Sequence, residues 1–262
     1  MILGISEIKE ITARMSETIG VDYNGYKMSF LRRRLPKVFE ELHLTKIADF
    51  YALLADRKGA DEIAYRMIVP DTELFRDPSV WRQLRKRLEA KQQLKVWFPM
   101  LSNGYELYSL MVILRQLGGR EIKIVVNSES QKAIDNVHNV HIPAKSKEVN
   151  ESNFERLEAT DDKVENYIEL TDDGARMKSE LLQGVEFHHN WFLSEPAATY
   201  DLIIARNRLL YYDYQLHERA VARFGESMVE GSILCIGTKE QLLHKLPNVQ
   251  ADKNVEGLYI KG

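Results

Sequence analysis

The sequence predicts a two-part α/β protein, in which a doubly wound sheet of mainly parallel strands follows an all-helical N-terminal region. Apolar residues recur every three or four positions over residues 6–66, as in a small helical bundle. The second half alternates helices with β-branched strands such as residues 122–126, and strands of that composition belong to a parallel sheet covered on both faces. The chain of 262 residues has room for two domains.

Spacing and terminal residues define the individual elements. Ser6 and Thr45 have side chains that favour helix N-termini, so we expect helices to begin there. Pro36 lacks the amide hydrogen that a helix interior needs, so we expect it to kink or restart the second helix. The other expected elements are strands at 95–98, 122–126, 185–189, 201–205 and 233–236, helices at 81–91, 106–117, 130–139, 214–229 and 239–246, and an antiparallel hairpin within 248–261.

Two breaks in these patterns set the expected domain boundaries. The polar turn at 71–78 follows the bundle, so we predict a helical domain and linker over 1–77 and an α/β domain over 78–262. The alternation fails again between about 140 and 184, where the sequence is polar and of mixed pattern. We expect a small inserted subdomain there, with a flexible excursion as the alternative.

Charge, cysteine content and hydropathy limit the partners and the cellular location that we expect for this protein. The net charge of -3 gives no general attraction to nucleic acid or to anionic membranes. The single cysteine, Cys235, lies in an apolar strand, where a thiol is usually part of the core. No apolar run is long enough to cross a bilayer, so we expect a cytoplasmic protein without membrane insertion.

Several well-known catalytic patterns are missing from the sequence. It has no G-x-x-x-x-G-K-S/T loop, no complete G-x-G-x-x-G, no H-E-x-x-H and no G-x-S-x-G. His138 and His141 have ligand-like spacing, but no carboxylate or thiol completes a site, and His188 and His189 should point to opposite faces of a strand. Phosphate-loop NTPases, zinc proteases and serine hydrolases are therefore disfavoured, and we expect no metal.

Two segments bring polar residues to the carboxyl ends of strands. An apolar strand breaks at 102–104 and resumes as a helix, which places Gly104 in the turn; ordinary α/β scaffolding shows the same pattern. A second buried strand ends in Arg206 and Asn207, and Tyr211 follows. Because ligands of doubly wound sheets bind at the carboxyl ends of strands, we expect both segments to face one crevice.

The second helix carries a basic run at 32–34, flanked by Lys27 and Lys37. Such a run is commonly a solvated face, and the alternative is a contact surface for an acidic partner. Nucleic-acid binding through this run and residues 82–95 is disfavoured, because aromatic residues are not interleaved as stacking platforms and the net charge is negative.

Taken together, these segments resemble the CheR family of chemoreceptor glutamate methyltransferases over nearly the whole chain. The linker T-E-L-F-R-D-P at 72–78 resembles the family's T-x-F-F-R-D-P, and S-N-G-Y-E-L-Y-S at 102–109 resembles S-x-G-E-E-P-Y-S. The strand V-E-F at 185–187 resembles the V-x-F strand after the family's inserted β-subdomain. D-L-I-I-A-R-N at 201–207, followed by Tyr211, resembles D-x-I-x-x-R-N-x-x-x-Y. Each match is weak alone, and the set is specific.

The resemblance implies a fold, a cofactor and a partner. It implies a Rossmann-like class I methyltransferase domain with an inserted β-subdomain, and S-adenosylmethionine bound between this domain and the helical one. The implied reaction methylates a glutamate of a chemoreceptor. The expected partner is therefore the cytoplasmic region of a chemoreceptor, or another signalling protein. Such methyl transfer depends on positioning rather than on a metal. The matching site residues are Arg76 and Tyr211 for catalysis, and Thr72, Arg76, Gly104, Glu106, Ser128, Trp191, Phe192, Arg206 and Asn207 for the cofactor.

Departures from the family pattern gather at this expected cofactor site. The chain has P-M-L at 99–101 where the family has small residues, and that bulk takes space the cofactor needs. Ser128 replaces the acidic residue that grips the ribose in this class of fold, and Glu129 should point to the opposite face if the strand continues. Tyr105, Leu107 and Pro70 replace a Glu, a Pro and an Asn, and Trp191 stands near the family's adenine-side Asn.

These departures favour a CheR-like binding or regulatory module with a degenerate S-adenosylmethionine site. A lost hydrogen bond to a charged group costs roughly 1.5 to 3 kcal/mol. Two such losses weaken binding about a hundredfold or more, at tenfold per ~1.4 kcal/mol. The alternative is an active S-adenosylmethionine-dependent protein-glutamate O-methyltransferase acting on chemoreceptors, since Arg76, Glu106, Arg206, Asn207 and Tyr211 are all present.

Overall fold

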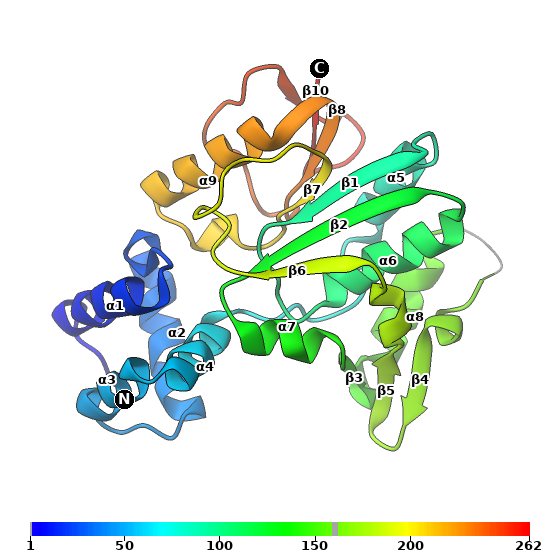
Figure 1. Ribbon diagram of the computed structural model, residues 1–262. Helices are drawn as coiled ribbons and strands as arrows, with labels where there is room; N and C mark the ends of the chain where they lie inside the picture. Colours follow the sequence, from blue (N-terminus) through cyan, green and yellow to red (C-terminus); the bar gives the residue numbers. More distant parts are fainter. Residues whose placement is uncertain (1, 159–161) are drawn as a thin grey trace.

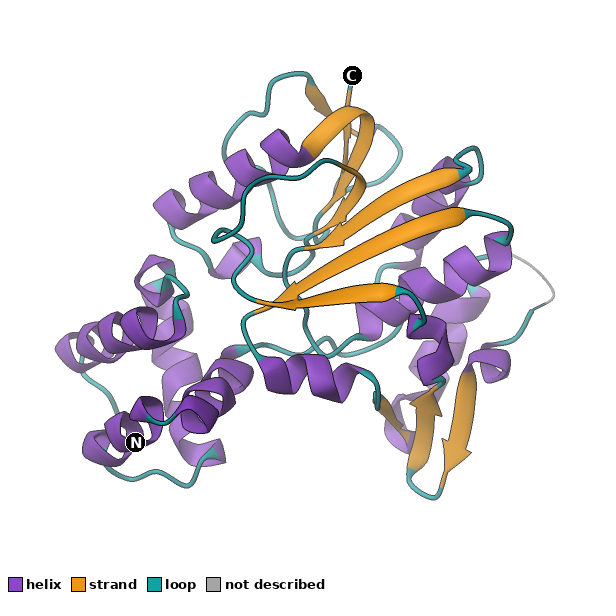
Figure 2. Ribbon diagram, viewed as in Figure 1, coloured by secondary structure: helices purple, strands orange, loops and turns teal. Residues whose placement is uncertain are grey.

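A helical domain lies beside a larger α/β domain in the computed structural model, which describes residues 2–158 and 162–262 (Figures 1 and 2). The apolar faces of the four long helices of the first domain pack into a core of their own. No helix in the described ranges is both long and apolar enough to span a bilayer. The helices of this domain are α1 (Ile5–Ile19), α2 (Met28–Glu41), α3 (Ile47–Ala55) and α4 (Arg57–Met67).

Two helix starts and the effect of one proline differ from the sequence predictions. The N-cap of α1 is Gly4, not Ser6, because the Glu7 carboxylate accepts a hydrogen bond from the Gly4 amide at 2.7 Å. The N-cap of α3 is Lys46, one residue after Thr45. Pro36 lies inside α2, which continues to Glu41 without restarting. Burial of Leu35 and Val38 offsets the missing hydrogen bond.

The α/β domain contains the doubly wound sheet that the sequence predicts. Its strand order is β6-β2-β1-β7-β8-β10-β9, with the first five strands parallel and β10 antiparallel to both neighbours. The last two strands form the predicted C-terminal hairpin. The elements are α5 (Pro78–Leu88), β1 (Gln93–Phe98), α6 (Tyr105–Leu117), β2 (Glu121–Ser128), α7 (Gln131–Val137), β6 (Val185–His189), β7 (Tyr200–Ile204), α9 (Tyr214–Ser227), β8 (Met228–Cys235), β9 (Val249–Ala251) and β10 (Leu258–Lys261).

The order of the strands reverses beside β1. The chain passes from β1 to β2 and β6 on one side, and it then returns to form β7 on the other side. Doubly wound sheets bind ligands at such a reversal, outside the carboxyl ends of the strands. In Figure 1 the arrowheads of β1, β2 and β6 point towards the helical domain, so this end of the sheet faces the join between the domains.

An inserted subdomain lies between α7 and β6, as the sequence predicts. Its antiparallel sheet has the order β3-β5-β4, and it projects at the lower right of Figure 1. The described part of the insert is therefore folded, which excludes the alternative of a purely flexible excursion. Its elements are β3 (His141–Pro143), α8 (Lys147–Glu155), β4 (Ile168–Thr171) and β5 (Gly174–Met177).

The helix predicted at 239–246 does not form, and this prediction is wrong. The segment consists of turns and irregular chain. The Glu240 carboxylate accepts backbone hydrogen bonds from Gly237 at 2.6 Å, Asn207 at 2.8 Å and Leu210 at 3.0 Å. These contacts draw the side chain inward and hold the loops around it, and a helix this short has little stability of its own to compete with them.

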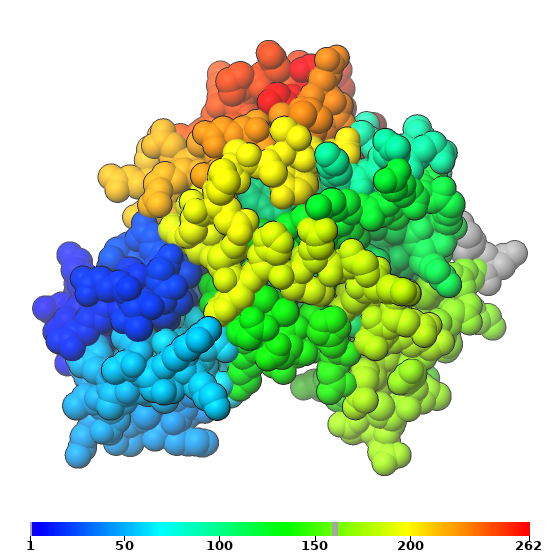
Figure 3. All heavy atoms as spheres, in the orientation of Figure 1, coloured from blue at the N-terminus to red at the C-terminus, as the bar shows by residue number. Residues whose placement is uncertain are grey.

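Contacts on two sides join the helical domain to the α/β domain. On one side the Asp61 carboxylate accepts hydrogen bonds from the backbone amides of Gln131 at 2.7 Å and Lys132 at 3.0 Å, at the start of α7. On the other side the Lys27 amide donates to the Tyr211 carbonyl at 2.8 Å. On the face drawn in Figure 3, atoms of the two domains are in contact.

Candidate functional site

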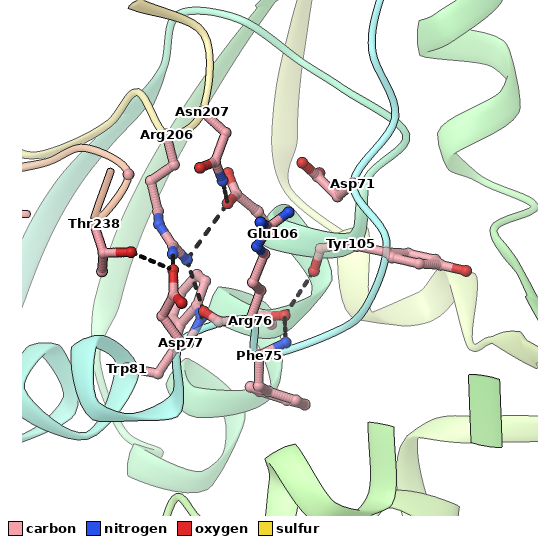
Figure 4. A network of polar contacts seen from close by, with 12 residues as sticks. Asp71, Phe75, Arg76, Asp77, Trp81, Tyr105, Glu106, Arg206, Asn207 and Thr238 are labelled. Carbon is pink, nitrogen blue, oxygen red and sulfur yellow. Dashed lines mark hydrogen bonds and ion pairs between the residues drawn. The ribbon is translucent and has the colours of Figure 1, made fainter. Parts of the chain in front are cut away.

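Arg206 lies at the centre of a polar network at the carboxyl end of β7 (Figure 4). Its side chain is fully buried, and its guanidinium Nη2 lies 2.6 Å from the Asp77 carboxylate. Its Nη1 lies 3.4 Å from the Glu106 carboxylate and donates to the Arg76 carbonyl at 3.1 Å. The guanidinium also lies over the Trp81 ring at 5.4 Å from the centroid. Arg206 therefore ties the linker to α6.

Glu106 and Asn207 approach this network from two different turns. Asn207 has a φ of +58°, and its side-chain amide donates to the Glu106 carboxylate at 3.3 Å. Glu106 lies in the first turn of α6, after Gly104 with a φ of +95°. A Cβ at Gly104 would lie 2.6 Å from Val137 Cγ2, so this close turn requires glycine.

Hydrogen bonds to the α6 segment fix the linker. The backbone of Asp71 both donates to and accepts from the Asn103 side chain, at 3.2 and 3.0 Å. The Phe75 amide donates to the Ser109 hydroxyl at 2.8 Å. The side-chain hydroxyl of Thr72 hydrogen-bonds its neighbour Glu73. These contacts place the predicted site residues Thr72 and Arg76 on a fixed strap across the carboxyl ends of the strands.

Arg76 is the most accessible charged group of this network. Its side chain is 40% exposed, and its Nε lies 3.9 Å from the Glu73 carboxylate. Figure 4 shows the side chain extending towards Glu106. Arg76 is thus placed to meet an anionic group from outside.

Burial perturbs two carboxyl groups at this site. It raises the pKa of Glu106 to about 8, and the nearby Asp71 carboxylate adds to the rise while Arg206 opposes it. Burial also raises the pKa of Asp71 to about 6, against the opposing charge of Arg208. Burial therefore favours the protonated form of Glu106, and the guanidinium of Arg206 only partly offsets this effect.

A second ion pair, between Arg208 and Glu129, lies beside this network. The Arg208 Nη2 and the Glu129 Oε1 are 3.1 Å apart, and both side chains are less than 10% exposed. The sequence argument places Glu129 on the opposite face only if the strand continues, and β2 ends at Ser128. Alternation stops there, so the Glu129 carboxylate turns inward. Sequence reasoning missed Arg208, whose signal is a charge among the apolar residues of R-N-R-L-L-Y-Y at 206–212.

The residues after β1 and β2 are packed into the protein interior. Met100 is 8% exposed, and its sulfur accepts a hydrogen bond from the Tyr212 hydroxyl at 3.0 Å. Leu101 is 2% exposed, and its amide donates to the Asn127 carbonyl at 2.9 Å. Ser128 is 1% exposed, and its hydroxyl hydrogen-bonds the Ser130 carbonyl at 3.0 Å within one turn.

The other predicted site residues contact different parts of the molecule. Phe192 packs on Phe224 of α9, with ring centroids 5.7 Å apart. Trp191 lies beneath Arg219 of the same helix at 5.5 Å. Tyr211 packs on Phe30 of the helical domain at 4.4 Å. The structure therefore brings together Arg76, Glu106, Arg206 and Asn207, whereas the contacts of these three aromatic residues lie elsewhere.

Three of the four histidines considered as metal ligands in the sequence lie close to a carboxylate. His141 lies 3.0 Å from Asp173, His188 lies 3.5 Å from Glu195, and His189 lies 3.8 Å from Asp61. Over residues 2–158 and 162–262, no group of three or more His, Cys, Asp or Glu side chains is arranged to hold a metal ion.

Strand order, linker and polar network together define a class I methyltransferase fold with an N-terminal helical domain. The model of the CheR methyltransferase S-adenosylmethionine-binding domain matches residues 70–255, and that of the CheR all-alpha domain matches residues 6–65. The chain belongs to the CheR methyltransferase family.

Relatives resemble the chain over most of its length. A putative methyltransferase Cher3 of Pseudomonas putida is 26% identical over 228 residues, which cover 84% of this chain and 83% of that protein. A chemotaxis protein methyltransferase of Listeria innocua is 25% identical over 243 residues, 89% of each chain. Among solved structures, a putative class I S-adenosylmethionine-dependent methyltransferase from Listeria monocytogenes is 9% identical with a TM-score of 0.37, covering 87% of this chain and 72% of that one.

Proposed function

We propose that this CheR-family protein is a signalling module that does not methylate, because its own side chains take the place of S-adenosylmethionine. Its role is to bind the cytoplasmic region of a chemoreceptor or another signalling protein. The observation that carries this proposal is the burial of the chain's own side chains at the carboxyl ends of β1, β2 and β7. Met100, Leu101 and the Arg208–Glu129 pair are all less than 10% exposed there.

The poor fit of S-adenosylmethionine to these residues supports the proposal. Cavities in the described part of the chain are lined by Glu129 or by Ser102 and Asn103, beside the strand ends, but none of these is lined by Glu106, Arg206 or Asn207. A donor seated at the reversal of the sheet would have to displace Met100 and separate Arg208 from Glu129. Leaving one partner of a buried ion pair alone costs about 3 to 5 kcal/mol. At tenfold per ~1.4 kcal/mol, that cost alone weakens binding by more than about a hundredfold.

Partner binding is proposed to use the polar network that remains. Arg76 is partly exposed beside Glu106, Arg206 and Asn207, so it can pair with a carboxylate on an incoming protein. We also retain as a proposal the division of the chain at residue 77, which makes the strap over 71–77 the joint between the two domains. Substitution of Arg76 tests this role through binding to receptor fragments.

An active protein-glutamate O-methyltransferase is the second candidate, and one observation favours it. Arg76, Glu106, Arg206 and Asn207 do converge in space, as they would to serve a methyl donor and a carboxylate acceptor. An enzyme of this kind needs the crevice to open while the polar network stays assembled.

Titration of S-adenosylhomocysteine into the protein by calorimetry separates the two candidates. We expect no saturable heat with ligand up to 1 mM. A dissociation constant in the low micromolar range would contradict the proposal. Incubation with radiolabelled S-adenosylmethionine and chemoreceptor cytoplasmic fragments provides the second readout, and we expect no base-labile methyl ester to form.

A further inference from the structure

The Arg208–Glu129 ion pair bridges the point where the order of the strands reverses. Glu129 is the first residue after β2, and Arg208 is the fourth residue after β7. Strand β1 lies between these two strands in the sheet, so the side chains reach across its carboxyl end to meet at 3.1 Å. The pair therefore closes the position at which doubly wound sheets hold their ligands.

Glu129 occupies the place of a ribose-binding carboxylate. In doubly wound dinucleotide-binding folds an acidic residue at the end of the second strand accepts hydrogen bonds from ribose hydroxyls. The sequence alone indicates that this acid is missing, because Ser128 stands at its position. Since β2 stops at Ser128, however, the inward carboxylate at this position belongs to Glu129.

Open space already lies next to this carboxylate. A cavity of about 370 Å³ between the two domains is lined by Glu129 and His189 from the ends of β2 and β6, and by Ile19, Leu54 and Asp61 of the helical domain. On the covered side, burial raises the pKa of Tyr26, and the negative charge of Glu129 adds to the rise. Glu129 thus has Tyr26 on one side and the open cavity on the other.

We infer that Arg208 is a specificity-determining residue that excludes adenosyl ligands by occupying and neutralising a ribose-binding carboxylate, Glu129. A ribose hydroxyl competes poorly for this carboxylate, because the guanidinium adds an opposite charge to its hydrogen bond in a buried setting, whereas the hydroxyl offers a hydrogen bond alone. Removing the guanidinium both frees the acceptor and vacates space at the end of β1. The inference rests on the proposed function, since it assigns the loss of donor binding largely to one side chain.

Arg208→Ala tests this inference by a gain of binding. We expect the variant to bind S-adenosylhomocysteine at least tenfold more tightly than the limit measured for the wild-type protein in the same calorimeter. The double variant Arg208→Ala with Glu129→Gln should lose that gain, since the acceptor charge is gone. Arg219→Ala is the matched control, because Arg219 also bridges the domains, pairing with Asp22 at 2.6 Å, but is half exposed.

Folding of the variant is followed in the same experiment. Arg208→Ala leaves a buried carboxylate unpaired, so Arg208→Gln, which keeps a donor for Glu129, is prepared in parallel. Melting temperatures are measured with and without 1 mM S-adenosylhomocysteine, because a ligand of the native state stabilises even a weakened variant. A ligand-induced rise in either variant, absent from wild type and Arg219→Ala, supports the inference.

Two negative results have separate meanings. If neither Arg208 variant binds or is stabilised by the ligand, whether folded or unfolded, the inference is overturned while the proposed function stands. If the wild-type protein itself binds the ligand tightly, the proposed function fails first.

Discussion

Replacing Arg206 by Met should destabilise the protein strongly, because this buried guanidinium holds the linker, α6 and β7 together. Its side chain is fully buried, and it contacts Asp77 at 2.6 Å and Glu106 at 3.4 Å. Methionine has a similar length without the charge, so it fills the space but leaves both carboxyl groups without their cation. Breaking a buried pair in this way costs about 3 to 5 kcal/mol.

The lower end of that range applies to this site. Glu106 has a pKa of about 8 and can remain protonated when the guanidinium is removed. Asp77 is 30% exposed and also accepts a hydrogen bond from the Thr238 hydroxyl at 3.2 Å. We therefore expect a loss of about 3 kcal/mol in the free energy of unfolding. For a chain of this size that loss lowers the melting temperature by about 6 to 12 °C.

Urea denaturation at pH 7, followed by circular dichroism, measures this loss. Arg219→Met is the control, because the Arg219–Asp22 pair has side chains that are 52% and 29% exposed. An exposed pair contributes about 1 kcal/mol or less. If Arg206→Met and Arg219→Met unfold at similar urea concentrations, the central role of Arg206 is refuted.

Two further predictions concern pH and one glycine. The folded-state pKa of Glu106, about 8, lies above its ordinary value, so the folded protein retains a proton that the unfolded chain releases. Unfolding free energy should therefore fall as pH rises from about 5 to 8, by up to ~1.4 kcal/mol per pH unit, and Glu106→Gln should flatten this slope in urea titrations across that range. Gly104→Ala should lower the free energy of unfolding by about 2 kcal/mol or more, because Gly104 has a φ of +95° and an added Cβ would lie 2.6 Å from Val137 Cγ2. Gly119→Ala is the control and should cost only ~1 to 2 kcal/mol, because Gly119 has a φ of +60° but no atom within 4 Å of an added Cβ. Equal losses of stability in thermal denaturation would disprove the steric argument.

Hydrophobic spacing predicted most of the elements of the fold. The helical bundle, the parallel sheet and the C-terminal hairpin all follow from apolar periods of 3.6 and 2 along the chain. The helix expected at 239–246 is absent because Glu240 makes contacts with loops distant in sequence. Local periodicity contains no information about such contacts.

The candidate site was predictable only where strand ends determine it. Arg206 and Asn207 follow β7, and Glu106 follows the Gly104 turn, so parallel pairing brings them together. The Arg208–Glu129 pair depends on the residue at which β2 stops, and a shift of one residue reverses the direction of a side chain. Sequence patterns locate strand ends less accurately than that.

Equilibrium dialysis of the wild-type protein against radiolabelled S-adenosylmethionine tests the central claim most directly. At protein concentrations of about 100 μM, the buried side chains at the ends of β1, β2 and β7 predict equal label on both sides of the membrane. An excess of label on the protein side that saturates at one donor per chain, and that unlabelled S-adenosylhomocysteine displaces, would contradict the account.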